Sequence, residues 1–283
     1  MNHSDPVQQA ENEPLTDRNS SPLGLTARAV PPTHTSTIHL RPTAALAERV
    51  LLPGDPGRAL ALAQLLLEAP LMFNHNRGLW GYTGKAADGE PLTIQSTGMG
   101  GPSAAIVLHE LISLGVMRAI RVGTCGALDP GLDLGDLVVA NEALATDGTS
   151  VALGAGDTTR ADPALTEALA QAVKRNRERG HREGRVVSTD LFYERDCTRN
   201  ASWGASGALA VEMEAATLFA MGANAGIQVA CLLVVSDNLH TDIQPPGCNP
   251  AFDGPEARIR IDDHALTQAA EAMGRAATAA LSA

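Results

Sequence analysis

Two arginines lie beside glycine-rich segments of the chain and could together hold an anion. Arg58 directly follows residues 53–57 (PGDPG), and Arg121 precedes residues 123–126 (GTCG). A guanidinium group offers a planar fork of donors that matches phosphate oxygens, while threonine hydroxyls and glycine amides add neutral donors. Taken alone, Arg58 is better explained as the start of an exposed helix face, and Arg121 as part of an ordinary ion pair. Taken together, they predict a phosphate cradle made of Gly54, Arg58, Arg121 and Thr124.

Acidic residues stand at two places where a carboxyl group could take part in chemistry. Residues 211–214 (VEME) precede an apolar helical run, so at least one of Glu212 and Glu214 falls at a helix start, where a carboxylate could accept hydrogen bonds from two neighbouring hydroxyls, as in a sugar diol. The simpler alternative is that it complements the helix dipole. Asp237 follows Ser236 and the apolar run 231–235, where a protonated carboxyl could donate to a departing nitrogen. Its simpler alternative is a capping or turn aspartate.

The elements that must position these residues alternate along the chain. Short apolar runs predict strands at 49–52, 92–97, 119–122, 137–140, 186–188 and 229–235, and amphipathic runs predict helices at 58–67, 103–114, 163–179, 214–225 and 263–281. Asp162 before Pro163 is a typical helix start. Glycine-bearing turns are expected at 53–57, 98–102 and 123–126, and residues 245–255 are expected to form a loop. Since ligands gather at the carboxyl ends of strands in such α/β folds, the three turns predict one pocket.

Composition limits the class of protein. The formal net charge of −11 argues against a nucleic-acid partner, because binding to phosphate backbones needs clustered Lys and Arg. No apolar stretch is long enough to span a membrane. Residues 1–37 are rich in polar residues and proline and predict a disordered tail, which leaves one domain at 38–283. The four cysteines show no C-x-x-C spacing, which favours a reducing, cytoplasmic location.

Common cofactor and metal motifs are missing from the sequence. The run from Gly98 through Gly100 to Ser103 lacks the third glycine of a dinucleotide fingerprint. There is also no Walker lysine motif and no histidine pair at zinc spacing. We therefore expect neither a metal nor an organic cofactor.

Seven segments in order resemble the hexameric, bacterial-type purine nucleoside phosphorylases, a family that also contains uridine and 5′-methylthioadenosine phosphorylases. They are residues 50–58 (VLLPGDPGR), 76–78 (NRG), 98–100 (GMG), 121–127 (RVGTCGA), 188–193 (STDLFY), 211–215 (VEMEA) and 235–237 (VSD). Their shared order and spacing are far more specific than any single motif. The resemblance implies one α/β domain with a central mixed β-sheet flanked by helices, assembled as a trimer of dimers.

The resemblance also implies a role for each candidate residue. Phosphate, as a co-substrate, would be held by Gly54, Arg58, Arg121 and Thr124, with Arg77 reaching in from a neighbouring subunit. The ribose would be contacted by Met99, Met213, Glu214 and, across the interface, His39. The base would lie among Cys125, Gly126, Phe192, Val211, Ser236 and Asp237, and Asp237 would protonate purine N7 as the glycosidic bond breaks.

The sequence departs from the family in one respect. Relatives of the enterobacterial type carry an arginine about thirteen positions beyond the catalytic aspartate, where it helps that residue donate its proton. Residues 245–250 (PPGCNP) contain none. Arg258, Arg260 and His240 are the candidates to replace it.

Several substrates and reactions remain open at this stage. The run after Phe192 and Tyr193 lacks the glutamine with which uridine phosphorylases bind uracil, so uridine ranks second to purines. Residues 234–239 (VVSDNL) also resemble the methylthioadenosine branch. A nucleosidase would use water and would not need the arginine cradle. A catalytically silent binding or storage protein would have lost the acid or the cradle, and both are present.

Overall fold

The computed structural model describes residues 37–175, 179–193, 196, 198–239 and 259–283. Apart from Thr37, the predicted tail lies outside these residues, as does the predicted loop at 245–255. In chain order the elements are β1 (Arg49–Leu52), α1 (Pro56–Leu66), β2 (Glu68–Asn74), the 3₁₀ turn η1 (Asn76–Gly78), β3 (Gly81–Lys85), β4 (Pro91–Gln95), α2 (Gly101–Ser113), β5 (Arg118–Ala127), β6 (Leu137–Ala145), α3 (Gly148–Ala152), β7 (Thr158–Arg160), α4 (Pro163–Arg175), β8 (His181–Ser188), α5 (Thr198–Ala205), β9 (Ala210–Glu212), α6 (Ala215–Ala225), β10 (Gln228–Asn238), β11 (Ile259–Arg260) and α7 (Asp263–Leu281).

The described strands form one mixed sheet in the order β11-β10-β6-β8-β9-β5-β1-β4-β3-β2, with β7 on β6. β1 pairs in parallel with β4 and β5, and β5 pairs in parallel with β10. β10 also pairs with β6, so the path β5-β10-β6-β8-β9 returns to β5 and this half of the sheet closes on itself. The carboxyl ends of β1, β4, β5 and β10 consequently lie at one edge.

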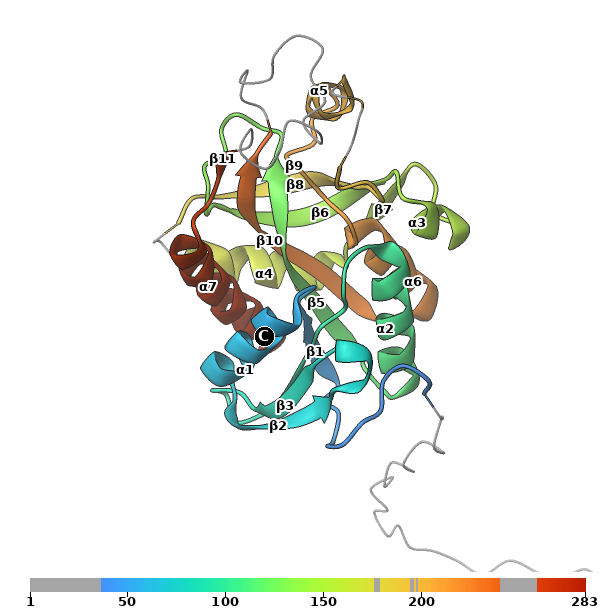
Figure 1. Ribbon diagram of the computed structural model, residues 1–283, viewed down its shortest axis with the longest axis vertical. Coiled ribbons are helices and arrows are strands. Elements are labelled where there is room, and N and C mark those ends of the chain that lie inside the picture. The colour runs from blue at the N-terminus through green and yellow to red at the C-terminus, as the bar shows by residue number, and fades with distance from the viewer. Residues whose placement is uncertain (1–36, 176–178, 194–195, 197, 240–258) are drawn as a thin grey trace, which may run out of the picture. The chain divides into compact units, whose positions relative to one another are not determined.

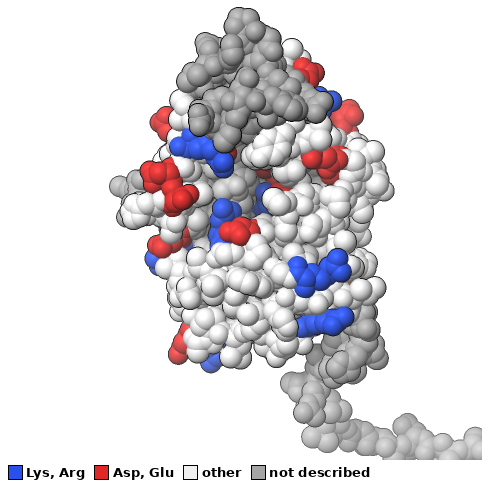
Figure 2. Space-filling model, in the orientation of Figure 1, with Lys and Arg blue, Asp and Glu red and all other residues white. Residues whose placement is uncertain are grey.

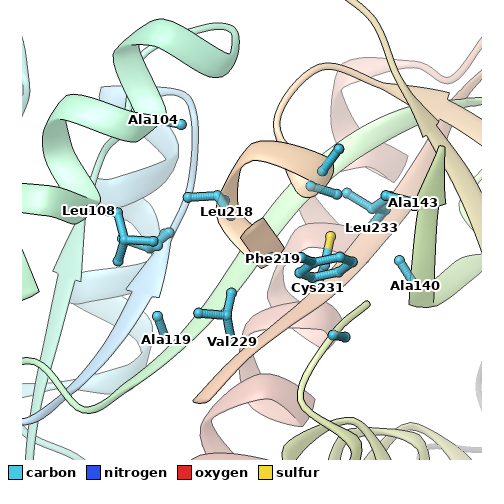
Figure 3. Close-up of a cluster of buried hydrophobic side chains, with 14 of the residues drawn as sticks. Ala104, Leu108, Ala119, Ala140, Ala143, Leu218, Phe219, Val229, Cys231 and Leu233 are labelled. Carbon is cyan, nitrogen blue, oxygen red and sulfur yellow. The ribbon is translucent and has the colours of Figure 1, made fainter. Parts of the chain in front are cut away.

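Helices cover both faces of the sheet and bury its apolar residues (Figure 1). On one face, α2 and α6 pack on β5, β6 and β10. Figure 3 shows this cluster, in which Leu108 of α2 lies toward Leu218 of α6, and Phe219 of α6 lies beside Cys231 of β10. On the other face, α1, α4 and α7 bury a second cluster that includes Leu62, and α7 packs against both other helices. No described helix is both long and apolar enough to cross a membrane.

The predicted fold class is confirmed, and α7 has the predicted bounds. The expected N-cap of α4 is also found, since Leu165 N donates to Asp162 Oδ1 at 2.8 Å. The turn expected at 123–126 is wrong, because these residues continue β5 against residues 233–237 of β10. The strands β2, β3, β7, β9 and β11 and the short helices α3 and α5 were not predicted. Most of them carry too few apolar residues to show a period, and the apolar run of β2, residues 69–73, does not alternate with polar residues.

Candidate active site

One cavity of about 420 Å³ opens where the carboxyl ends of β1, β4, β5 and β10 meet. It brings together most of the predicted site residues, although they are far apart in sequence. On the face shown in Figure 2, acidic and basic side chains are interspersed, and both signs meet in a recess near its centre. The predicted residues that line the cavity are Gly54, Arg58, Met99, Arg121, Thr124, Cys125, Gly126, Phe192, Val211, Met213, Glu214, Ser236 and Asp237.

Arg58 enters the cavity from the first turn of α1. Asp55 caps this helix, accepting hydrogen bonds from Gly57 N and Arg58 N at 3.0 Å, and Pro56 occupies its first position. Burial lowers the pKa of the Arg58 guanidinium; the Asp55 carboxylate opposes this shift and the Arg121 guanidinium adds to it. No ion pair of Arg58 is found within the described residues. A half-buried cation beside a second cation at a helix N-terminus favours a bound anion.

Arg121 is buried in β5 and held by two carboxylates. Its Nε donates to Glu212 Oε2 at 2.9 Å, and its second terminal nitrogen contacts Glu214 Oε2. Burial alone would lower the pKa of Arg121, but Glu214 and Glu212 raise it above its usual value. A Cβ on Gly123 would lie 2.7 Å from this guanidinium. The glycine therefore makes room for the arginine rather than forming a turn.

Glu212, the other glutamate of the segment 211–214, orders this corner of the cavity. Besides Arg121 it accepts hydrogen bonds from the Ser188 hydroxyl and from the backbone N–H groups of Glu214 and Ala215, at 2.9 and 2.8 Å for the two amides. A buried carboxylate with this many donors is a positioning group. Its place two residues before Glu214, at the end of β9, is the signal that could have identified it.

Glu214 is the N-cap residue of α6, but its side chain does not cap the helix. Instead its Oε1 accepts from Gly100 N at 2.5 Å, in the glycine turn that carries Met99. Burial raises the pKa of Glu214, with Arg121 opposing and Glu212 reinforcing the shift. The carboxylate thus faces the cavity between Met99 and Met213, where its remaining lone pairs can accept hydrogen bonds from hydroxyl groups.

Asp237 also lines the cavity, near the end of β10. The pairing of β10 with β5 shifts register between Val235 and Asp237, so Ser236 forms a bulge. Side chains normally alternate between faces, and the bulge allows both Ser236 and Asp237 to line the cavity. Ser236 Oγ donates to Asp237 Oδ2 at 2.8 Å.

Arg260 is paired with Asp237 across the antiparallel β10–β11 ladder. Its Nε lies 2.8 Å from Asp237 Oδ1, although this oxygen accepts no well-directed hydrogen bond within the described part of the chain. The contact is therefore an ion pair in which Oδ1 is buried against the Arg260 guanidinium. Of the three candidates for the missing arginine, Arg260 lies at the aspartate, whereas Arg258 and His240 lie outside the described residues.

The wall beside Asp237 is mainly apolar. Phe192, Val211 and Cys125, which were expected around the base, line the cavity, as do Leu191, Trp203 and Leu239. Burial raises the pKa of Cys125, and the negative charge of Glu212 raises it further, so the thiol stays neutral. Asn200 of α5 is the lone side-chain amide among the described lining residues. Neither Asn200 nor Trp203 was predicted, because α5 carries no motif.

His39 and Arg77 do not line the cavity of their own chain. His39 Nδ1 lies 2.8 Å from Glu110 Oε1 of α2. Arg77 is exposed in η1, where it has a positive φ of 60°. Both residues were expected to act in a neighbouring subunit's site, and their position is compatible with that expectation.

Residues 48–282 match the family model of the Phosphorylase superfamily, so the chain belongs to this superfamily. The chain is 41% identical over 199 residues to the DeoD-type purine nucleoside phosphorylase of Alkaliphilus metalliredigens (strain QYMF), covering 69% of this chain and 84% of that protein. It is 40% identical over 202 residues to the protein of the same name from Geobacillus kaustophilus (strain HTA426), covering 70% and 84%. The crystal structure of uridine phosphorylase from Vibrio fischeri ES114 matches with a TM-score of 0.71 at 26% identity, covering 84% of this chain and 92% of that one.

Proposed function

We propose that the protein is a purine nucleoside phosphorylase, a pentosyltransferase that converts a purine nucleoside and inorganic phosphate to ribose 1-phosphate and free base. The observation that carries this proposal is that Arg58, Arg121, Glu214 and Asp237 line one cavity. An anion site, a diol acceptor and an acid thus surround a space of about 420 Å³. Superfamily membership and the purine nucleoside phosphorylases among the relatives support the same reaction.

The proposed reaction uses position and charge. Phosphate bound by Gly54, Arg58, Arg121 and Thr124 lies beneath the sugar, where it opposes the positive charge that develops on the ribose and attacks C1′. Glu214 accepts hydrogen bonds from the 2′- and 3′-hydroxyls. Asp237 gives a proton to purine N7, a contribution of ~10²–10⁴ in rate for general acid catalysis.

The proposal also concerns which nucleobases the enzyme accepts. The sequence relatives act on purine nucleosides by name, whereas the structural relative is a uridine phosphorylase, so uridine is the second candidate. A carboxyl group at Asp237 can serve purines with either a 6-amino or a 6-oxo group, so we include adenosine beside inosine and guanosine. The proposal keeps the cytoplasmic location, the domain at 38–283 and the homohexamer, in which His39 and Arg77 complete a neighbour's site.

The test is a substrate panel assayed with and without added phosphate, using adenosine, inosine, guanosine, uridine and 5′-methylthioadenosine. We expect phosphate-dependent release of purine bases. Arg58→Ala should raise the KM for phosphate at least tenfold, since a charge-assisted hydrogen bond contributes about 1.5–3 kcal/mol. Arg58 is preferable to Arg121 here, because removing Arg121 leaves Glu212 and Glu214 buried without their cation.

Arg275→Ala is the matched control, because Arg275 is exposed on α7 and pairs with Glu271 of the same helix at 3.7 Å. Its phosphate kinetics should equal those of the wild type. Cleavage at equal rates without phosphate would identify a nucleosidase instead, and an unchanged phosphate KM in Arg58→Ala would remove the cradle from the mechanism.

A further inference from the structure

Glu110, a buried residue of α2 outside the cavity, binds the segment that carries His39. Its Oε1 accepts from Ile38 N at 3.1 Å and from His39 N at 3.0 Å, and its Oε2 accepts from Leu40 N at 2.6 Å. The same Oε1 lies 2.8 Å from His39 Nδ1. One carboxylate therefore holds both the backbone and the imidazole at the start of the described chain.

The contact with Glu110 determines which nitrogen of His39 is free. Burial raises the pKa of Glu110, but hydrogen bonds from Leu40, His39 and Ile38 outweigh this and lower the pKa below its usual value. Glu110 is thus an ionised, acceptor-only group, so His39 Nδ1 must carry the proton that it shares. In the neutral imidazole, Nε2 is then the acceptor, and it points away from Glu110.

The segment around His39 is also tied to the turn that carries Arg77. Asn76 Nδ2 donates to the His39 carbonyl at 2.8 Å, and Asn74 Oδ1 accepts from Arg41 N at 2.9 Å. The two residues that do not line their own cavity therefore belong to one hydrogen-bonded unit.

Large apolar side chains stand exposed around this unit. Ile38 is 72% exposed, Leu71 62% and Trp80 39%. Neighbouring residues that combine apolar side chains with ordered polar groups are typical of a surface that another chain covers. The occupant that the proposed function supplies is a second copy of this chain.

We propose that Glu110 is a positioning residue that holds His39 with Nε2 as an acceptor for the 5′-hydroxyl of a nucleoside bound to a neighbouring copy. This inference rests on the proposed function. Glu110 touches neither substrate nor phosphate, and it acts by fixing the orientation and the proton position of the imidazole.

The experiment measures kcat/KM for inosine and for 5′-deoxyinosine, which lacks the hydroxyl, and takes their ratio. We expect the wild type to prefer inosine about tenfold, as one well-placed hydrogen bond would give. Glu110→Gln should bring this ratio close to one, because an amide cannot fix the Nδ1 proton and also accept the three backbone N–H groups. Activity on 5′-deoxyinosine should fall much less than activity on inosine.

Two further variants separate positioning from general support of the fold. His39→Asn keeps a donor near the place of Nδ1 but lacks Nε2, so it should lose the preference with an unchanged thermal midpoint. Glu142→Gln is the control, since Glu142 is another buried glutamate, paired with Arg185 far from this segment. It should leave the ratio at the wild-type value even where it lowers stability.

An unchanged ratio in Glu110→Gln, or equal losses on both nucleosides, would overturn the proposal. If Glu110→Gln does not fold, Glu110→Asp provides the same comparison, because the shorter carboxylate keeps its charge but cannot reach both the backbone N–H groups and the imidazole. If the wild type cleaves no nucleoside in phosphate, the proposed function fails; calorimetric dissociation constants for the two nucleosides then give the ratio independently.

Discussion

At the residue scale, the site depends on charges that are paired before any substrate arrives. Arg121 is held by Glu212 and Glu214, and Asp237 lies beside Arg260. Side chains fixed in this way need little reorganisation when charge develops in the transition state, which is the physical basis of electrostatic catalysis. Arg58 is the exception, because no carboxylate pairs with it within the described residues.

We predict that Asp237→Asn depresses adenosine cleavage more than guanosine cleavage. An amide cannot transfer a proton to N7. Its NH₂ group can still donate a hydrogen bond to O6 of guanine, whereas adenine has no O6 atom to accept it. We expect a loss of about 10²–10⁴ in kcat for adenosine. Steady-state assays of both nucleosides test this, and equal losses would count against a role of Asp237 at N7.

A second prediction concerns Arg260 as the group that assists Asp237. Arg260→Leu should lower kcat for adenosine about 10–100-fold, because Arg260 supports only part of the rate contribution of the general acid Asp237. The KM for phosphate should stay unchanged. Arg260→Lys should recover part of the rate because it restores the cation.

7-Methylguanosine is the control substrate for Arg260, because its alkylated N7 needs no proton. Its cleavage should be nearly normal in Arg260→Leu. A loss as large as that for adenosine would show that Arg260 only supports the local fold.

The sequence allowed much of this site to be predicted, and its failures have physical causes. Arg58, Arg121, Glu214 and Asp237 could be identified because each stands beside a strand end or a helix start. The bulge at Ser236 could not, since it depends on the register between β10 and β5. Arg260 was one of three candidates because linear distance does not show that β11 returns to pair with β10.

At the element scale, long apolar segments were predictable and short ones were not. β10 and α7 bury continuous or periodic apolar residues, so their pattern alone identifies them. β9 and β11 are held by pairing with neighbours, which the sequence does not display. The glycines of β5 resembled a turn, but they make room for Arg121 and for Leu239, whose Cδ1 would lie 2.5 Å from a Cβ on Gly126.

An ion pair that joins β1 to the loop before β4 leads to a prediction about stability. Arg49, buried in β1, donates from its two terminal nitrogens to Asp88 at 2.6 and 2.7 Å, and Ser282 after α7 also donates to Asp88. These contacts, led by the bond from Arg49, hold the pKa of Asp88 well below its usual range. Asp88→Asn should lower the free energy of unfolding by about 1–2 kcal/mol at neutral pH. This value is at the low end for a hydrogen bond between charged groups because Asp88 is partly exposed.

The pH dependence follows from the sign of this shift. A carboxyl group whose pKa is depressed by folding stabilises the native state above its unfolded pKa, and this contribution is lost as the pH falls toward the folded pKa. The free energies of unfolding of the wild type and Asp88→Asn, measured with urea, should therefore differ less at pH 3 than at pH 7. Glu271→Gln, which removes an exposed pair at 3.7 Å, should show little difference at either pH. A difference in the free energy of unfolding between wild type and Asp88→Asn that is the same at both pH values would refute the ion-pair explanation.

At the scale of the whole molecule, the cavity contains only part of the expected site. Gly54, Arg58 and Arg121 line it, whereas His39 and Arg77 lie outside it on their own chain. If neighbouring copies supply these two residues, two variants that are impaired on opposite sides of the interface should complement each other. Arg58→Ala damages a chain's own cavity, while Arg77→Ala damages only the cavity of its neighbour.

We therefore predict that, at limiting phosphate, co-refolding Arg58→Ala with Arg77→Ala restores activity above that of either variant alone. With random assembly, about a quarter of the sites combine an intact Arg58 with an intact Arg77 from the adjoining copy, so about a quarter of wild-type activity should return. Mixing Arg58→Ala with Arg121→Ala should restore nothing, because both residues belong to the same chain's cavity. Recovery in neither mixture would mean that each chain completes its own site, and Arg77 would then have no part in phosphate binding.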